Sequence, residues 1–257
     1  MPYFERLEEH RFRATGSVSG AWDVAHQHIA PALGLLVHAV ELDRDRRRGD
    51  RLMLSRLSYD ILGTVPVDIV EIGVRVLRPG RTIELVEASL SHEGRAAVLL
   101  RAWLVQRGGN QRVAGTPLPP MPPPAEVPAW DPTTVWPGGF IGSVEVRRDQ
   151  DEPGRARFWV RTGTALLDDE PVSEVARSAG LLDIANGMTV RASPREVAFP
   201  NVDLTAHFFE EPRGKWVGFD TAVSFGATGL GVTSSVIHDE HGPVGTLVQS
   251  LTVRPSG

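Results

Sequence analysis

Alternating apolar and polar residues divide this chain into two groups of four consecutive strands. In the second half, the stretch 199–253 reads as four strands separated by short turns. In the first half, glycine and proline separate similar runs rich in valine, leucine and isoleucine, at residues 52–62, 67–77, 82–91 and 96–106. Each group predicts an antiparallel meander.

A helical pattern precedes each meander. Pro31 opens the first one, in which Leu33, Leu36, Val37 and Val40 recur at helical spacing. Pro171 opens the second helical pattern, and Asn186-Gly187 ends it. Its apolar positions are Val172, Val175, Ala176, Ala179 and Leu182. A helix followed by a meander, twice, predicts an α+β fold in which each half wraps one sheet around one helix.

The two meanders repeat one another. Gly94 and Gly242 stand 148 residues apart, and the same offset matches Ser55 with Asp203. Because Ser55 alternates with Leu57 and Tyr59, we expect its face to point inward. Carried across the repeat, this register predicts that Asp203 points inward as well.

The predicted register also assigns the neighbours of Asp203. Thr205 and His207 would share its inward face, whereas Leu204, Ala206 and Phe208 would face outward, where a second copy of the chain could cover them. On the last strand, Gln249 alternates with Leu247, Leu251 and Val253 and is predicted to be buried. A buried carboxylate and a buried carboxamide need partners or a function.

A proline-rich stretch separates the halves. Prolines concentrate at residues 117–128, and glycines lie on either side of this run. Such a composition favours an extended path, as in a spacer between domains. The predicted organisation is therefore an N-terminal domain at 1–107, a linker at 108–137 and a C-terminal domain at 138–257.

Composition limits the chemistry. The 257 residues contain no cysteine, which excludes disulfides, thiolate catalysis and cysteine metal sites. The spacing of the histidines follows no known ligand pattern, so no metal site is predicted. A formal net charge of −5 disfavours nucleic acid as a partner, and no apolar run reaches the length of a membrane span. These features predict a soluble, cytoplasmic protein.

In its order of elements and in five motifs, the chain resembles the double hot-dog proteins of the acyl-CoA thioesterase superfamily, of which bacterial thioesterase II is the best-known member. The resemblance covers nearly the whole chain. Its motifs are Gln27-His28-Ile29-Ala30-Pro31-Ala32, Asp183-Ile-Ala-Asn186-Gly187, Asn201-Val-Asp203-Leu-Thr205, Pro212-Arg-Gly214-Lys-Trp216 and Asp239-Glu-His-Gly242-Pro243-Val-Gly245-Thr-Leu-Val-Gln249.

The resemblance implies a double hot-dog fold, hydrolysis of an acyl-CoA thioester without a cofactor, an apolar acyl tunnel beside the helices, and association into a homo-oligomer. In the family, an aspartate, a hydroxyl residue and a glutamine hold the hydrolytic water. The matching positions are Asp203, Ser224 (or Thr228 after a small shift) and Gln249. The thioester carbonyl would lie against the start of the first helix, at His28, Ile29 and Ala30.

Two other functions stay open at this stage. Relatives carry Gly-Gly where this chain has Ile29-Ala30, a difference that favours a non-catalytic protein that binds acyl thioesters or another apolar ligand. A hot-dog hydratase or dehydratase would use an Asp-x-x-x-x-His motif, and the sequence has no convincing copy of it beside a helix. Release of free thiol from acyl-CoA distinguishes hydrolysis from binding.

Overall fold

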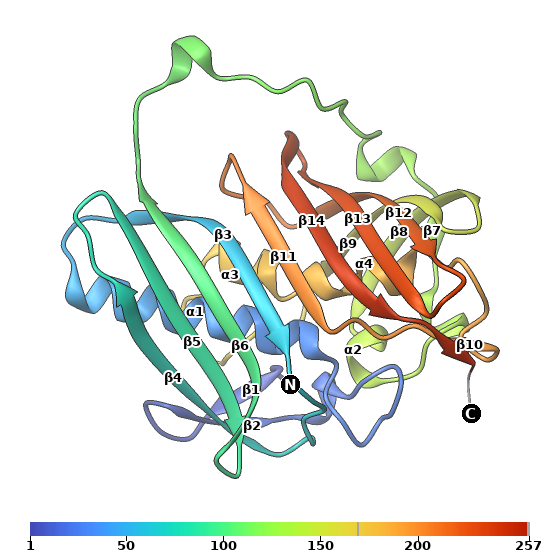
Figure 1. Cartoon of the computed structure of the whole chain (residues 1–257), viewed down its shortest axis with the longest axis horizontal. Coiled ribbons are helices and arrows are strands. Elements are labelled where there is room, and N and C mark those ends of the chain that lie inside the picture. Colours follow the sequence, from blue (N-terminus) through green and yellow to red (C-terminus); the bar gives the residue numbers. More distant parts are fainter. Residues whose placement is uncertain (169, 256–257) are drawn as a thin grey trace.

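One continuous antiparallel sheet forms the framework of the protein. The computed structural model describes residues 1–168 and 170–255, within which thirteen strands follow the order β1-β2-β4-β5-β6-β3-β11-β14-β13-β12-β9-β8-β7 (Figure 1). The first half contributes β1 (Phe4–Arg6), β2 (Arg11–Ala14), β3 (Leu52–Ile61), β4 (Ile69–Arg78), β5 (Ile83–His92) and β6 (Arg95–Gln106). The second half contributes β7 (Ala129–Trp130), β8 (Val144–Glu152), β9 (Arg155–Thr162), β11 (Asp203–Phe208), β12 (Val217–Phe225), β13 (Leu230–Asp239) and β14 (Gly242–Thr252). The short strands β10 (Val197–Ala198) and β15 (Arg254–Pro255) pair separately.

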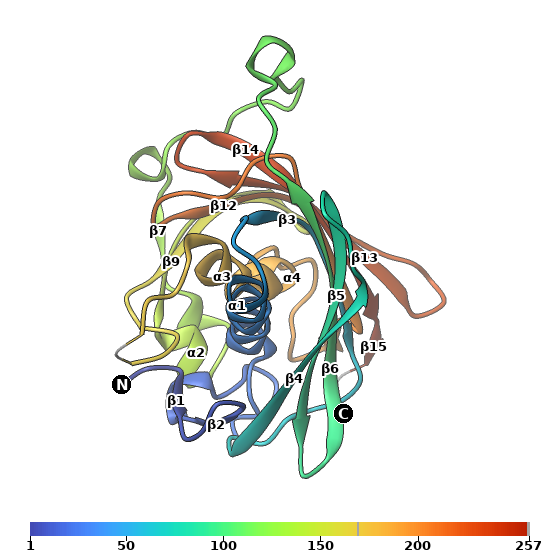
Figure 2. The same cartoon turned by 90° about the vertical axis from the view of Figure 1, so that its left-hand side faces the viewer.

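The predicted first helix is confirmed as α1 (Ile29–Arg47), around which the sheet curves (Figure 2). Its apolar face is fully buried, at Leu33, Leu36, Val37 and Val40. The helix begins two residues before Pro31, because the side chain of His28 accepts a hydrogen bond from the Ala30 amide and caps the first turn. Proline is tolerated there because amides in the first turn lack helical acceptors.

The predicted second helix is interrupted. It consists of α3 (Glu174–Ala179), a 3-10 turn (Leu182–Ile184) and α4 (Ala185–Met188). α3 lies directly against α1, where a Cβ atom on Gly34 would stand 2.7 Å from the carbonyl oxygen of Ala176 and 3.0 Å from the Cα of Gly180. Glycine at position 34 therefore permits the close crossing of the two helices.

The structure corrects the predicted register of β11. Leu204 and Ala206 are fully buried in the core, whereas Thr205 is partly buried and His207 is exposed. The reason is the offset between the two meanders. The buried Leu57 of β3 matches Leu204 at 147 residues, so the inferred offset of 148 was one residue too long, and an error of one residue turns every side chain of a strand to the other face. Leu204 and Ala206 therefore belong to the core, and Phe208 packs against it. This strand gives no support to the predicted association of copies, which stays a prediction.

The proline-rich segment packs against the second half of the sheet. The indole N–H of Trp159 donates to the carbonyl of Pro122 (2.8 Å), and Met121 contacts a small cluster of Val127, Trp159 and Trp216. Further along, the chain forms the short helix α2 (Gly139–Gly142). In Figure 1 the residues that follow β6 form an arch above the sheet.

The two halves meet where β3 pairs with β11, and each half places helical segments on the concave side of its strands (Figure 2). This arrangement confirms the predicted α+β double hot-dog fold. No helix in residues 1–168 and 170–255 has the length and apolar character needed to cross a membrane.

Candidate functional site

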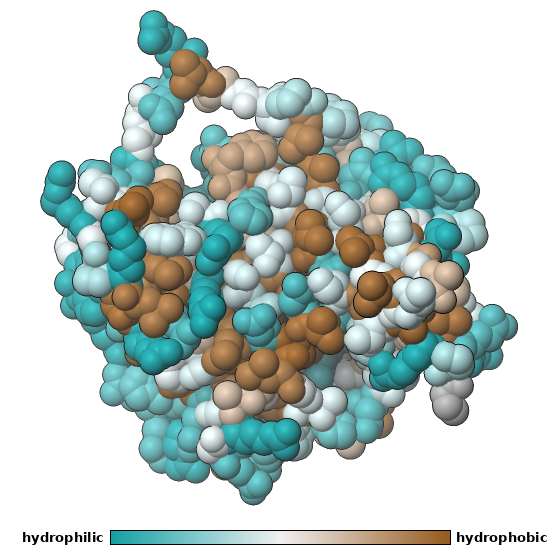
Figure 3. Space-filling model, in the orientation of Figure 1, coloured by the Kyte–Doolittle hydropathy of each residue, from teal (hydrophilic) through white to brown (hydrophobic). Residues whose placement is uncertain are grey.

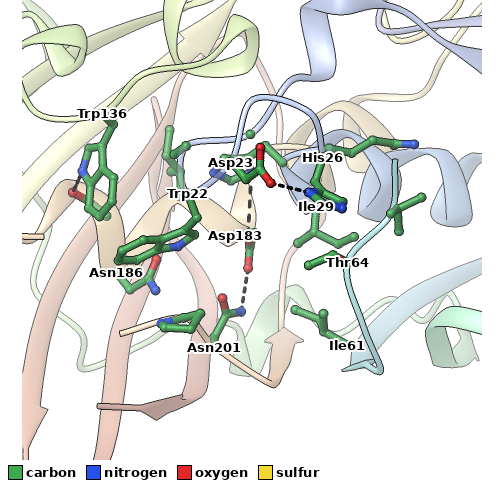
Figure 4. Close-up of a pocket in the computed structure, with 18 of the residues that line it drawn as sticks. Trp22, Asp23, His26, Ile29, Ile61, Thr64, Trp136, Asp183, Asn186 and Asn201 are labelled. Carbon is green, nitrogen blue, oxygen red and sulfur yellow. Dashed lines mark hydrogen bonds and ion pairs between the residues drawn. The ribbon is translucent and has the colours of Figure 1, made fainter. Parts of the chain in front are cut away.

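A cavity of about 300 Å³ lies at the N-terminal end of α1, where both halves contribute residues (Figure 4). The first half supplies the loop before α1 and the end of β3 with the turn that follows it, at 20–23, 26–29 and 61–65. The second half supplies Trp136, Ile141 and the segments 183–184, 186–188 and 199–201. The cavity is therefore a product of the tertiary fold, because its walls come from separate parts of the chain.

Asp183 is the carboxylate at this cavity. It lies on the 3-10 turn between α3 and α4, and its side chain is only 7% exposed. The side-chain amides of Asn201 and Gln249 both donate to Asp183 Oδ1, at 2.7 and 3.2 Å. These two donors fix the orientation of the carboxyl group and leave Oδ2 as the second acceptor.

Burial changes the acidity of Asp183. Desolvation raises its pKa to about 7, although the hydrogen bonds from Asn201 and Gln249 act in the opposite direction. The carboxyl group is therefore about half ionised near neutral pH. A carboxylate with a pKa close to the pH of the medium is suited to accept a proton during a reaction.

His28 is a neutral neighbour of this carboxylate. Burial lowers its pKa to about 3, and its Nδ1 accepts the Ala30 amide, so the single proton of the ring belongs on Nε2. Nδ1 lies 3.8 Å from Asp183 Oδ2. Because the imidazole is uncharged, this contact is not an ion pair, and it does not lower the pKa of the aspartate.

The start of α1 forms part of the wall of the same cavity. Ile29 is the first residue of the helix, and it lines the cavity close to His26 and Asp183 (Figure 4). Amides in the first turn have no acceptor within the helix, and the helix dipole places partial positive charge there. Since the Ala30 amide already donates to His28, the Ile29 amide is the donor best placed to stabilise an anion.

Gln249 connects Asp183 to a polar patch on the concave side of the sheet. It is fully buried, and it stands opposite Thr233, also fully buried, in the pairing of β14 with β13. Among the described residues, Gln249 Oε1 and Thr233 Oγ1 are buried without a hydrogen-bond partner. Unpaired buried polar atoms are costly, which makes a purely structural role a poor explanation for this pair.

Of the three residues predicted to hold the water, only Gln249 belongs to the site: it is buried behind the cavity wall and donates to Asp183. Asp203 points outward, and its Oδ1 accepts the Ser250 amide at 2.6 Å on the exposed side of the sheet. Ser224 is exposed on β12, and Thr228 is exposed in the turn that follows. The expectation that Asp203 faces inward beside Gln249 is wrong, because the offset that transferred the register from the first meander was one residue too long.

Of the residues predicted to contact the substrate, His28 and Ile29 line the cavity, whereas Ala30 is buried beneath them. The sequence analysis missed Asp183, Asn201 and Thr233 as site residues. A signal for Asp183 was present, since a carboxylate interrupts the apolar run at residues 181–185. A charged residue on the buried face of a helical segment is uncommon without a partner or a function.

Three aromatic rings form one wall of the cavity. Trp22 meets Trp136 and Phe199 edge-to-face, with ring centroids 4.8 and 5.4 Å apart. Trp136 is fixed by its indole N–H, which donates to the carbonyl of Gly187 at 2.8 Å. Trp136 falls within the predicted linker, so part of that segment contributes to the site.

Comparison with known proteins agrees with this architecture. A family model described as the acyl-CoA thioesterase N-terminal domain matches residues 18–105, and one described as the acyl-CoA thioesterase C-terminal domain matches residues 117–253. A search of curated proteins finds no match.

Solved structures from three bacteria share the fold. A hot-dog protein of unknown function from Alicyclobacillus acidocaldarius has a TM-score of 0.76 at 15% identity, over 98% of this chain and 96% of that one. The acyl-CoA thioesterase II TesB2 from Mycobacterium marinum has a TM-score of 0.69 at 16% identity, over 99% and 96%. The tesB protein from Mycobacterium avium subs paratuberculosis has a TM-score of 0.67 at 18% identity, over 98% and 96%.

Proposed function

Because this chain belongs to the acyl-CoA thioesterase family, and is thus a thioester hydrolase, we propose that it hydrolyses acyl-CoA at the cavity beside α1, with Asp183 as the general base. The observation that carries this proposal is the buried Asp183 carboxylate, which two amides hold through one oxygen while the other is left for a reactant.

In the proposed reaction, Asp183 Oδ2 accepts a proton from a water molecule as that water attacks the thioester carbonyl carbon. A carboxylate in water is a weak base, but the raised pKa of Asp183 increases its affinity for the proton at neutral pH. Asn201 and Gln249 keep Oδ1 occupied, so that the lone pairs of Oδ2 are the ones available.

Attack by water moves negative charge onto the carbonyl oxygen of the thioester. The Ile29 amide, at the positive end of a 19-residue helix, supplies a fixed donor for this charge. His28 is neutral, and its Nδ1 is occupied, so its contribution is to hold the first turn of α1 in place.

Collapse of the tetrahedral intermediate breaks the carbon–sulfur bond. The thiolate of CoA leaves, and the proton that Asp183 accepted is returned to the leaving sulfur or to solvent. The overall reaction consumes one water and yields a free acid and CoA. A thiolate is a good leaving group, so this chemistry needs no covalent nucleophile, in agreement with the absence of cysteine from the sequence.

Free thiol release from acyl-CoA tests the assignment. We expect turnover by the native protein and a loss of at least about a hundredfold in kcat for Asp183→Asn, because the variant keeps the size of the side chain but cannot accept the proton. Asp203→Asn is the matched control and should retain nearly full activity, since Asp203 lies on the exposed face.

The same assay distinguishes the alternatives. Undiminished turnover in Asp183→Asn would remove Asp183 from the mechanism, and a large loss in Asp203→Asn would restore the assignment based on the family pattern. Acyl-CoA binding without any release of thiol by the native protein would favour the non-catalytic binder.

A further inference from the structure

The cavity is closed off from the space along α1. Tyr59, on β3, is fully buried, and its hydroxyl donates to the carbonyl of Leu33 at 3.2 Å. Leu33 and Leu36 are also fully buried, and neither they nor Tyr59 line the cavity. The helix and the sheet are thus packed together just where an acyl tunnel beside α1 would have to run.

The closed end limits the size of the acyl group. At about 300 Å³, the cavity lies at the small end of the range of ligand pockets, which is roughly 300–1,000 Å³. The thioester itself occupies part of this space, because the carbonyl has to reach Ile29 and Asp183. A short acyl group fits, whereas a long fatty acyl chain has no space to extend into.

The aromatic side chains in the cavity wall favour a short acyl group that contains an aromatic ring. Trp22, Trp136 and Phe199 come from three separate segments and already contact one another edge-to-face. Aromatic rings prefer such tilted contacts, and each one stabilises a complex beyond the area that it buries. Figure 4 shows Trp22 between Trp136 and the Asp183 side of the cavity, where an acyl group would pass.

We propose that this site selects acyl-CoA thioesters whose acyl group is compact and carries an aromatic ring, and that Trp22 determines this preference. The inference rests on the proposed hydrolysis at Asp183. Trp22 is the member of the aromatic wall that can be changed without opening the core, because it is 47% exposed on a loop, whereas Phe199 is fully buried and Trp136 is 3% exposed.

A panel of acyl-CoA thioesters tests the size limit with the native protein. We expect kcat/KM to be highest for phenylacetyl-CoA, lower for hexanoyl-CoA, and at least about tenfold lower again for palmitoyl-CoA, whose chain exceeds the cavity. Equal or higher kcat/KM for palmitoyl-CoA would overturn the proposal.

Variants of Trp22 test the role of the ring. Trp22→Ala should lower kcat/KM for phenylacetyl-CoA by roughly threefold to tenfold, mainly through KM, because the ring contact is made in both the ground state and the transition state. The loss for hexanoyl-CoA should be smaller. Trp22→Phe should recover most of the preference, since it restores an aromatic face.

The control is Trp103→Ala, since Trp103 lies on β6, away from the cavity, and packs against Arg78. The Trp103→Ala variant should show the same preference among the thioesters as the native protein. An equal loss on all thioesters in Trp22→Ala would overturn the role of Trp22. The proposed selectivity and the proposed catalysis can fail separately. If the thioester panel or the Trp22 variants contradict the selectivity, the role of Asp183 still stands as long as Asp183→Asn abolishes turnover of the best substrate.

Discussion

The behaviour of Asp183 follows from the balance between burial and hydrogen bonding. Burial favours the neutral acid, whereas the amides of Asn201 and Gln249 stabilise the carboxylate, and the net result is a pKa of about 7. An ordinary surface aspartate is ionised at this pH but is a far weaker base. The site thus keeps enough of the ionised form while raising its basicity.

This balance predicts how kcat/KM depends on pH, and a mutation at Gln249 should shift the midpoint of that dependence. The base acts when ionised, so kcat/KM should rise with pH to a plateau, with a midpoint near 7 in the native protein. Gln249→Leu removes a donor that lowers the pKa of Asp183, so the midpoint should move to higher pH, with a larger loss of activity at pH 6 than at pH 9. Steady-state kinetics across this range provides the measurement.

Asp203→Asn serves as the control for this profile, since Asp203 accepts the Ser250 amide on the other face of the sheet. Its midpoint should equal that of the native protein. A midpoint that stays fixed in Gln249→Leu, or that shifts downward, would contradict the role of Gln249 as a donor to the base.

At the scale of elements, β11 shows how an error of one residue in register changes what a strand is expected to do. The buried Leu57 of β3 corresponds to Leu204 of β11, 147 residues later, whereas an offset of 148 matches it with Thr205. Leu204 therefore lies in the core, and Asp203 lies on the other face of the strand. The carboxylate of the site comes instead from the interrupted helix, where the 3-10 turn carries Asp183.

The orientation of β11 has a measurable effect on stability. Leu204→Ala leaves a cavity in the core and should lower the free energy of unfolding by about 2–5 kcal/mol. Asp203→Asn alters a partly buried side chain on the outer face of the sheet and should change the free energy of unfolding by less than about 1 kcal/mol. Urea unfolding of both variants provides the comparison. A greater loss in Asp203→Asn than in Leu204→Ala would reverse the assigned faces.

At the scale of the whole molecule, the two halves share one sheet and one core. β3 and β11 pair directly, and the hydroxyls of Ser58 and Thr205 hydrogen-bond across this junction at 3.0 Å. One cluster of buried residues extends from Tyr3 to Leu251. The cavity lies at the boundary of the two halves, so the site depends on their association.

Such a shared core predicts that the halves unfold together. Calorimetry should give a single transition for the full chain, with a ratio of calorimetric to van't Hoff enthalpy close to one. Loss of the aromatic signal and loss of secondary structure should have the same midpoint. Two resolved transitions would instead favour two independently stable domains joined by the proline-rich segment.

The sequence by itself determined the architecture, because the helix and the strands depend on local patterns of burial. The spacing of Leu33, Leu36 and Val40 was sufficient to predict α1, and period-two alternation was sufficient to predict the meanders. It also identified Gln249 as an inward residue, since Gln249 alternates with the apolar Leu247 and Leu251 on its own strand.

Only the tertiary structure decided which residues meet at the site. Asp183 contacts Asn201, 18 residues away, and Gln249, 66 residues away, and no sequence period relates these positions. The direction in which Asp203 points depended on the pairing of β11 with β14, in which Ala206 stands opposite Leu247, and the repeat inferred from the sequence was one residue out of this register. Burial, which raises the pKa of Asp183, exists only once both halves enclose the carboxylate.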